Sequence, residues 1–232
     1  MKLSNASTFQ ILINKFTSVK LAQLSFGHIE QADSSYFELN LANGNALTLS
    51  ENAFAGLKQA YMSKFILFFN IVESSLCVPS NFLTNLSQSK NSTVRLTFLL
   101  NESNNLVFNR QALSNLKQSQ HSFLQIYVLK SNNLVLNSQS VADLSQSKSS
   151  SFEVWASKGN FIIRAGALKN VTQGEYSSIR IGFTSESKSI FKQSPYALDN
   201  FSPHPTAEIV YDFAKGNIKS SVLYFMSLIQ YF

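Results

Sequence analysis

The sequence LTLSENAFAGLKQ, from Leu47 to Gln59, is closely matched by LVFNRQALSNLKQ, from Leu106 to Gln118. Both stretches begin with apolar residues two apart, continue through a polar segment into apolar residues three apart, and end on Lys-Gln. Self-similarity at a fixed spacing is the sequence signature of repeat architectures. The pair therefore indicates that one structural motif recurs along the chain.

The motif recurs about eight times, with successive copies about 28 residues apart. Five copies align without a gap, starting at Phe9, Phe37, Ile66, Leu96 and Leu124, and copies starting at Phe152, Ile181 and Glu208 match less closely. The closing glutamines are Gln31, Gln59, Gln88, Gln118, Gln146, Gln173 and Gln230, with Pro203 in the seventh position. We expect a single repeat domain over residues 1–232, with a divergent copy at 181–203. Residues 147–151 are the best candidate for a weak boundary, although an ordinary inter-repeat loop is the favoured interpretation.

Each copy carries the same local signals. Leu124, Ile126 and Val128 alternate with less apolar residues, a polar turn follows, and Leu134 and Leu136 form a second short apolar run. This pattern is typical of a β-hairpin. A helix-capping residue such as Ser50 then precedes eight or nine residues with apolar side chains three apart, which favours a short helix. The sequence thus predicts an α+β fold of ββα repeats, with hairpin sheets and short helices on one side.

The ends of the array lack polar capping units. Open repeat arrays generally need such units, yet the first copy begins at Phe9 and the last ends in the apolar sequence SLIQYF. We therefore expect either that the repeats close on themselves or that the ends are buried against another subunit.

Composition favours self-association over binding to highly charged partners. The formal charge is +6, but only 14% of residues are charged, so the basic balance reflects a shortage of acids. A surface carried by Ser, Asn and Gln produces little repulsion between neighbouring copies. The charge is therefore only a weak indication of nucleic-acid binding.

Several classes of protein are disfavoured. Cys77 is the single cysteine, so no intrachain disulfide or cysteine metal cluster is possible. The three histidines His28, His121 and His204 are far apart in sequence, and no metal-ligand spacing or phosphate loop occurs. We expect no enzyme activity, no cofactor and no metal site. The N-terminal residues lack a signal-peptide pattern and the apolar run Phe65–Val72 is too short to span a bilayer, which leaves localisation open.

Two polar features could serve a ligand. The recurrent glutamine could form a ladder that contacts a repetitive ligand, but its amide is better explained as a tie between neighbouring units. Five lysines lie in or beside the predicted hairpin turns and could form a rim that binds phosphates. They are Lys15, Lys130, Lys158, Lys188 and Lys215. Solvated lysines at turns are common, so the structural interpretation is favoured here as well.

The stretch LTLSENAFAGLKQ resembles the final strand and helix of the whirly and transcriptional-coactivator folds, which bind single-stranded DNA. The resemblance covers about 13 residues per copy, and those folds place four strands before each helix where this motif has two. The resemblance implies, as a hypothesis, that the chain binds single-stranded nucleic acid. It does not identify which residues of this chain would bind. Aromatic side chains such as Phe68, Phe69, Tyr127 and Trp155 could stack on bases if exposed.

These observations favour a non-enzymatic structural or assembly protein that acts through protein–protein contacts with itself or other subunits, such as a component of a virion or another large complex. The alternative is a single-stranded nucleic-acid-binding protein that uses the turn lysines and sheet aromatics. A third hypothesis, a glycan-binding module, requires exposed Trp155 or tyrosines beside carboxylates and amides.

Overall fold

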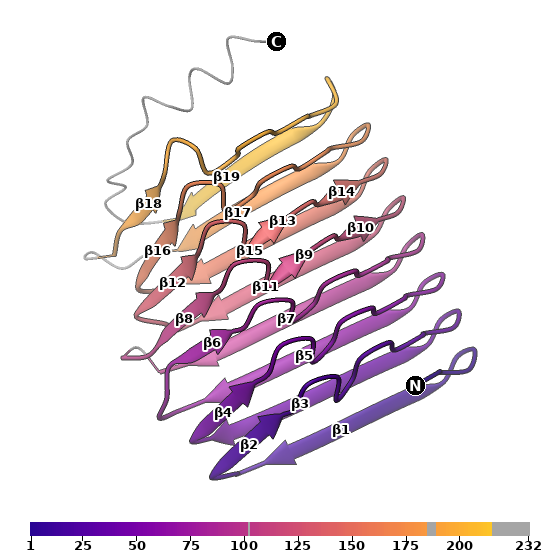
Figure 1. The fold of residues 1–232 in the computed structure, drawn as a ribbon, viewed down its shortest axis with the longest axis vertical. Coiled ribbons are helices and arrows are strands. Elements are labelled where there is room, and N and C mark those ends of the chain that lie inside the picture. The colour runs from indigo at the N-terminus through magenta and orange to yellow at the C-terminus, as the bar shows by residue number, and fades with distance from the viewer. Residues whose placement is uncertain (102, 185–188, 215–232) are drawn as a thin grey trace.

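The chain forms an open parallel β-solenoid (Figure 1). The structure, a computed structural model, describes residues 1–101, 103–184 and 189–214. Eight long strands pair side by side in chain order into one parallel sheet, with β1 and β19 at its edges. They are β1 (Thr8–Asn14), β3 (Tyr36–Gly44), β5 (Lys64–Ile71), β7 (Thr93–Leu100), β11 (Phe123–Leu129), β15 (Ser151–Ser157), β17 (Ser178–Thr184) and β19 (Glu208–Ala214). We call this the long sheet, and each turn of the chain around the axis a coil.

Short strands form the opposite side of the solenoid (Figure 1). Two of them, β2 (Ser18–Leu21) and β4 (Ala46–Leu49), pair with each other. A five-stranded parallel sheet contains β6 (Leu76–Val78), β8 (Asn105–Phe108), β12 (Asn133–Leu136), β16 (Asn160–Ile163) and β18 (Phe191–Gln193). Two further pairs are β9 (Leu113–Ser114) with β13 (Val141–Ala142), and β10 (Lys117–Gln118) with β14 (Ser145–Gln146).

The predicted hairpins are not formed. The two strands of one copy pair with the equivalent strands of the next copy, so that Leu124 aligns with Phe152 and Leu134 with Phe161. Alternation of apolar and polar residues only shows that one face of a strand is buried, and it does not identify the partner strand. Here the turn between the two strands carries the chain to the other side of the core, where the apolar faces meet.

The predicted short helices are also wrong, because the described residues contain no helix. Residues 50–57 instead form consecutive tight turns, with Asn52 and Gly56 in the left-handed region at φ of 57° and 72°. Their backbone bonds reach the next coil, since Phe54 N donates to Phe82 O at 3.0 Å and Gly56 N to Thr84 O at 2.8 Å. Left-handed residues four apart cannot occur in an α-helix. The apolar residues three apart therefore lie in consecutive turns. The prediction of an α+β fold is wrong, because the described residues form an all-β solenoid.

The repeat itself is confirmed, with two corrections. The ungapped alignment is wrong for the third and fourth copies, which it started at Ile66 and Leu96. In the structure the residue that pairs with Phe37 is Phe65, and the residue that pairs with Phe65 is Val94. The extra residues lie in the turn that follows each long strand, where a change of length leaves the strand pairing intact. The described coils stack in an open row, with β1 and β19 at opposite edges of the long sheet (Figure 1). Most of the eighth copy, with Gln230, lies outside the described residues.

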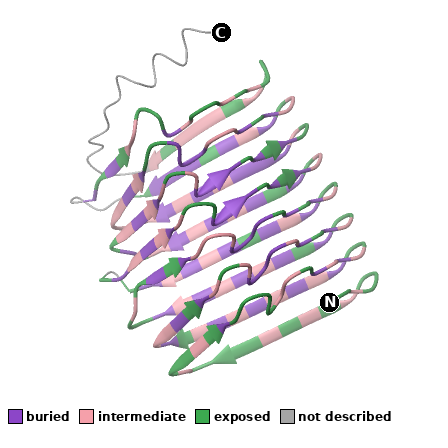
Figure 2. Cartoon of the chain, in the orientation of Figure 1, coloured by how far each residue is buried: buried purple, intermediate pink, exposed green. Residues whose placement is uncertain are grey.

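The core lies between the long sheet and the short strands. Inward side chains on inner long strands such as β5, β7 and β11 are buried and alternate with more exposed outward ones (Figure 2). Phe65 stacks on Phe37 with ring centroids 4.8 Å apart, and Phe37 stacks on Phe9 at 5.5 Å. Residues in register on neighbouring parallel strands lie about 4.8 Å apart, so like side chains stack into ladders. The described residues include no helix long and apolar enough to span a bilayer.

Candidate functional site

The recurrent glutamines form a buried ladder that holds the coils together. Nε2 of Gln59, Gln88, Gln118, Gln146 and Gln173 each donates to Oε1 of the glutamine one coil earlier, at 2.9–3.1 Å. Each also donates to a backbone carbonyl of the following coil, as Gln118 does to Ser151 O at 2.9 Å. Because these side chains are buried, the ladder is closed to an external ligand. The interpretation of the glutamine as a tie between units is confirmed, although no helix end is involved.

The described lysines of the predicted rim occupy one structural position. Lys15, Lys130 and Lys158 each follow a long strand, in the corner turn that leads to the short strand, with φ of 59°, 57° and 68°. Their backbone N–H groups donate to the next coil, at Ala42 O, Ser157 O and Thr184 O. Lys188 and Lys215 lie outside the described residues.

The three described lysines do not form a continuous rim. Lys130 and Lys158 follow the neighbouring strands β11 and β15, whereas Lys15 follows β1, which β3, β5 and β7 separate from β11. Asn43, near the end of β3, is also in the left-handed region, with φ of 56°. Two of the three lysines therefore come together, in the coils that carry Tyr127 and Trp155.

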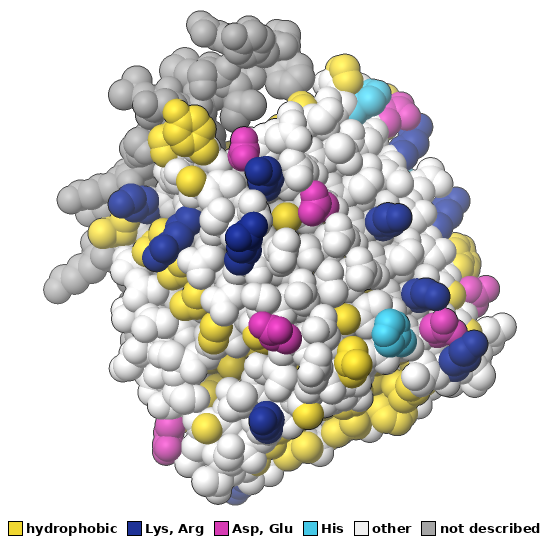
Figure 3. Space-filling model, viewed as in Figure 1, with side chains coloured by type: hydrophobic (Ala, Val, Ile, Leu, Met, Phe, Trp, Pro, Cys, Tyr) yellow, Lys and Arg dark blue, Asp and Glu magenta, His cyan; other side chains and the backbone are white. Residues whose placement is uncertain are grey.

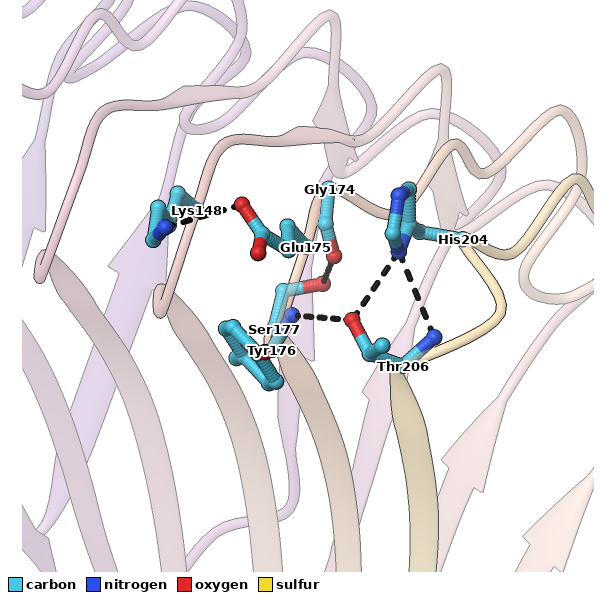
Figure 4. Close-up of polar contacts among 7 residues, drawn as sticks. All are labelled: Lys148, Gly174, Glu175, Tyr176, Ser177, His204 and Thr206. Atoms are coloured by element: carbon cyan, nitrogen blue, oxygen red, sulfur yellow. Dashed lines mark hydrogen bonds and ion pairs between the residues drawn. The ribbon is translucent and has the colours of Figure 1, made fainter.

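Polar side chains in the turns that precede β17 and β19 contact one another and the turn before β15 (Figure 4). Lys148 Nζ lies 2.9 Å from Glu175 Oε2, and this hydrogen-bonded pair raises the pKa of Lys148. The same ammonium lies 5.5 Å from the centre of the Tyr176 ring. Tyr176 N donates to Thr206 Oγ1 at 3.0 Å, and Thr206 N donates to His204 Nδ1 at 3.2 Å. Thr206 Oγ1 and His204 Nδ1 thus each accept a hydrogen bond from a backbone N–H group of these turns.

The histidines are placed in separate coils. His28 lies in a turn of the first copy, His121 in the turn that precedes β11, and His204 in the turn that precedes β19. Within the described ranges, no three His, Cys, Asp or Glu side chains approach closely enough to hold a metal ion.

The first coil exposes an apolar end face. β1 pairs with β3 on one side and has no partner strand on the other among the described residues. It contains no fully buried residue (Figure 2), whereas its counterpart β3 buries Phe37, Leu39 and Leu41. We define the end face by Leu3, Phe9, Ile11, Ile13, Phe16, Val19 and Phe26, all in the first coil and only partly buried or exposed. Hydrophobic side chains gather along this lower edge of the molecule (Figure 3).

Charged residues flank one margin of this coil. Glu30 lies between Lys2 and Lys58, with carboxylate to ammonium distances of 3.0 Å and 3.4 Å. Hydrogen bonds from Lys2 and then Lys58 hold the pKa of Glu30 below its usual value. The polar margin and apolar centre give the end face the layout of a protein interface.

The sequence pattern did not distinguish this face from the core. Phe9, Ile11 and Ile13 alternate in the same way as Phe37, Leu39 and Leu41, and only their place in the first coil leaves them uncovered. Their place in the first copy of the repeat was the available signal. Comparisons of the chain with protein-family models, with curated proteins and with solved structures found no match.

Proposed function

We propose that this chain is a non-enzymatic structural protein that assembles with a second copy of itself through the end face of the first coil. The observation that carries the proposal is the uncovered apolar face beside the edge of β1 that no other described strand pairs with. Ile13 is 38% exposed, whereas its in-register neighbour Leu41 is fully buried. A contiguous exposed apolar surface next to a free strand edge favours association.

A second copy is the occupant that best complements this surface. The end face has the outline of one coil, with a long strand edge, a short strand edge and apolar side chains between them. Another coil offers the same outline, so backbone pairing and apolar contact can form together. Face-to-face contact between two first coils is isologous and closes as a two-fold dimer.

The nucleic-acid alternative has weaker support. The segment Leu47–Gln59 contains no helix, so its resemblance to single-stranded DNA-binding folds does not extend to its conformation. Lys130 and Lys158 are adjacent, but Lys15 is remote from them. Phosphate binding by a protein depends on several clustered cations.

Light scattering after size exclusion, over a range of protein concentrations, tests the proposal. We expect the wild type to form a dimer that persists in high salt, because apolar burial is not screened. Ile13→Lys should yield monomers by placing a charge in the end face. Leu12→Lys is the matched control, since Leu12 lies on the same strand but points outward and is 65% exposed; it should remain a dimer.

Three outcomes would overturn the proposal. They are a wild type that stays monomeric at high concentration, an Ile13→Lys variant that dimerises like wild type, and a monomer that binds a mixed-sequence single-stranded oligonucleotide at low salt and releases it at high salt. The last outcome would support the nucleic-acid alternative.

A further inference from the structure

The outer face of the long sheet carries two parallel rows of side chains that neither the core nor the end face uses. One row places Arg95, Gln125, Glu153 and Arg180 in register on β7, β11, β15 and β17. Two residues further along the same strands, the second row contains Thr97, Tyr127, Trp155 and Gly182. Because residues two apart on a strand share a face, both rows point outward.

The indole of Trp155 lies against the sheet. A Cβ atom at Gly182 would collide with Cε3, Cδ2 and Cζ3 of Trp155, so the ring covers the place where a side chain on β17 would stand. Gly182 is accordingly buried although its position faces outward, and Trp155 is half-buried. One face of the indole therefore rests on the strand backbone, which leaves the opposite face available to a ligand.

Tyr127 extends this aromatic platform by one strand. It is in register with Trp155 and half-buried. The guanidinium carbon of Arg95 lies 5.5 Å from the Tyr127 ring centre. The Tyr127 hydroxyl can both donate and accept a hydrogen bond, and burial raises its pKa above the ordinary value.

The polar row is already ordered by its own hydrogen bonds. Nε and Nη2 of Arg95 donate to Gln125 Oε1 at 3.1 Å and 2.9 Å, and Gln125 Nε2 donates to Glu153 Oε2 at 3.0 Å. Glu153 Oε1 accepts from Ser151 Oγ at 3.1 Å. Groups that are held in place before binding lose little conformational entropy when a ligand arrives.

We propose that this surface, over β7, β11, β15 and β17, binds a linear glycan chain. The apolar face of a pyranose ring stacks on Trp155, and its hydroxyl groups bond to the Tyr127 hydroxyl and to the amide, carboxylate and guanidinium of the adjacent row. One pyranose unit of an extended chain spans a distance close to the strand spacing of about 4.8 Å. Successive sugars can therefore meet successive strands.

The charges of the face favour a glycan over a nucleic acid. In the polar row Glu153 lies between Arg180 on one side and Gln125 and Arg95 on the other, and Glu38 has the equivalent position on β3, beyond Ile66 on β5. The two carboxylates offset the two arginines, so the row lacks the clustered positive charge on which phosphate binding depends, whereas carboxylates accept hydrogen bonds from hydroxyl groups. This face is distinct from the end face, so glycan binding and self-association can each fail without the other.

Trp155 is the only tryptophan, so its fluorescence reports directly on the site. The test titrates the protein separately with cellohexaose, chitohexaose, xylohexaose and a hexamer of galacturonic acid. We expect a saturable emission change with at least one hexamer. Calorimetry with that hexamer should show affinity lowered by roughly tenfold or more in Trp155→Ala, as is usual for a central aromatic contact, and a smaller loss in Glu153→Gln.

Two further variants separate binding from folding. Gly182→Val lifts the indole off the sheet while keeping tryptophan, and it should weaken glycan binding with the β-sheet circular dichroism retained. Phe123→Ala removes an exposed aromatic on β11 outside the two rows and should bind like wild type. The proposal is overturned if no hexamer gives a saturable change, if Trp155→Ala binds as tightly as wild type, or if a single-stranded oligonucleotide binds this face and the glycans do not.

Discussion

Gln88 Nε2 donates hydrogen bonds to Gln59 Oε1 and to the carbonyl oxygen of Phe123, each at 3.0 Å. The Gln88 amide thus links its own coil to the preceding coil, through Gln59, and to strand β11, through Phe123. Repeated along the chain, this arrangement links every coil from Gln31 to Gln173 through a buried polar ladder. In a solenoid, where each repeat contacts only its neighbours, such ties determine how strongly adjacent coils are coupled.

Replacing Gln118 by methionine should destabilise the protein strongly. Methionine has a similar shape, but it removes two donated hydrogen bonds and leaves Gln88 Oε1 and Ser151 O without that donor. An unsatisfied buried group costs about 1–3 kcal/mol. We expect a loss of at least about 2 kcal/mol in the free energy of unfolding, measured by urea denaturation.

The matched control is Gln23→Met, which changes an exposed glutamine in a turn of the first coil. It should alter stability by less than about 0.5 kcal/mol. Equal losses in the two variants would show that the ladder contributes no special stability.

The repeat could be predicted from sequence, whereas the path of the chain within each repeat could not. Alternating residues such as Leu124, Ile126 and Val128 mark a strand with one buried face, and this was correct. The same alternation suits a hairpin or a parallel stack, because it contains no information on the partner strand. In residues 50–57 the spacing of Phe54 and Leu57 suits a helix. However, Asn52 and Gly56 are left-handed and the backbone of this segment bonds to the next coil, and neither feature can be read from the spacing.

Individual residues of the candidate surfaces could be predicted from the sequence, but their arrangement in space could not. Trp155 and its neighbouring carboxylate could be named, but the register that sets Trp155 beside Tyr127 and over Gly182 depends on parallel pairing between coils. Lys130 and Lys158 were placed correctly in turns, whereas their separation from Lys15 follows from the stacking order.

The phenylalanine ladder leads to a graded prediction. Phe65 is fully buried, stacks on Phe37 and meets Phe54 edge-on at 5.7 Å. Phe65→Ala should cost about 3–5 kcal/mol, as expected for truncation of a buried phenylalanine. Phe9→Ala, at the half-buried end of the same ladder, should cost less than half as much when unfolding is measured at a protein concentration below that of self-association. Similar costs would mean that the first coil is covered as completely as the inner ones.

The left-handed turn residues offer a stabilising change. Met62 has a φ of 55° and is 49% exposed, so its side chain contributes little packing while its backbone is strained. The left-handed conformation costs an L-residue about 1–2 kcal/mol. Met62→Gly should therefore raise the free energy of unfolding by about 0.5–1 kcal/mol after the greater flexibility of unfolded glycine is deducted. Met62→Ala keeps the strain and should show no gain; a gain equal to that of glycine would assign the effect to the side chain.

The ion pairs at Glu30 predict a pH dependence of defined sign. Because the Lys2 and Lys58 ammonium groups lower the pKa of Glu30 in the folded protein, the stabilisation is present above the unfolded pKa near 4.5 and disappears as pH falls through the lower folded value. Glu30→Gln should therefore lower the melting temperature slightly at about pH 7, and this effect should shrink as the pH falls below the unfolded pKa. High salt should shrink the difference at neutral pH, since the pairs are exposed. Glu51→Gln, at an exposed carboxyl in a turn, is the control, and a Glu30→Gln effect that grew towards acid pH would contradict the assignment.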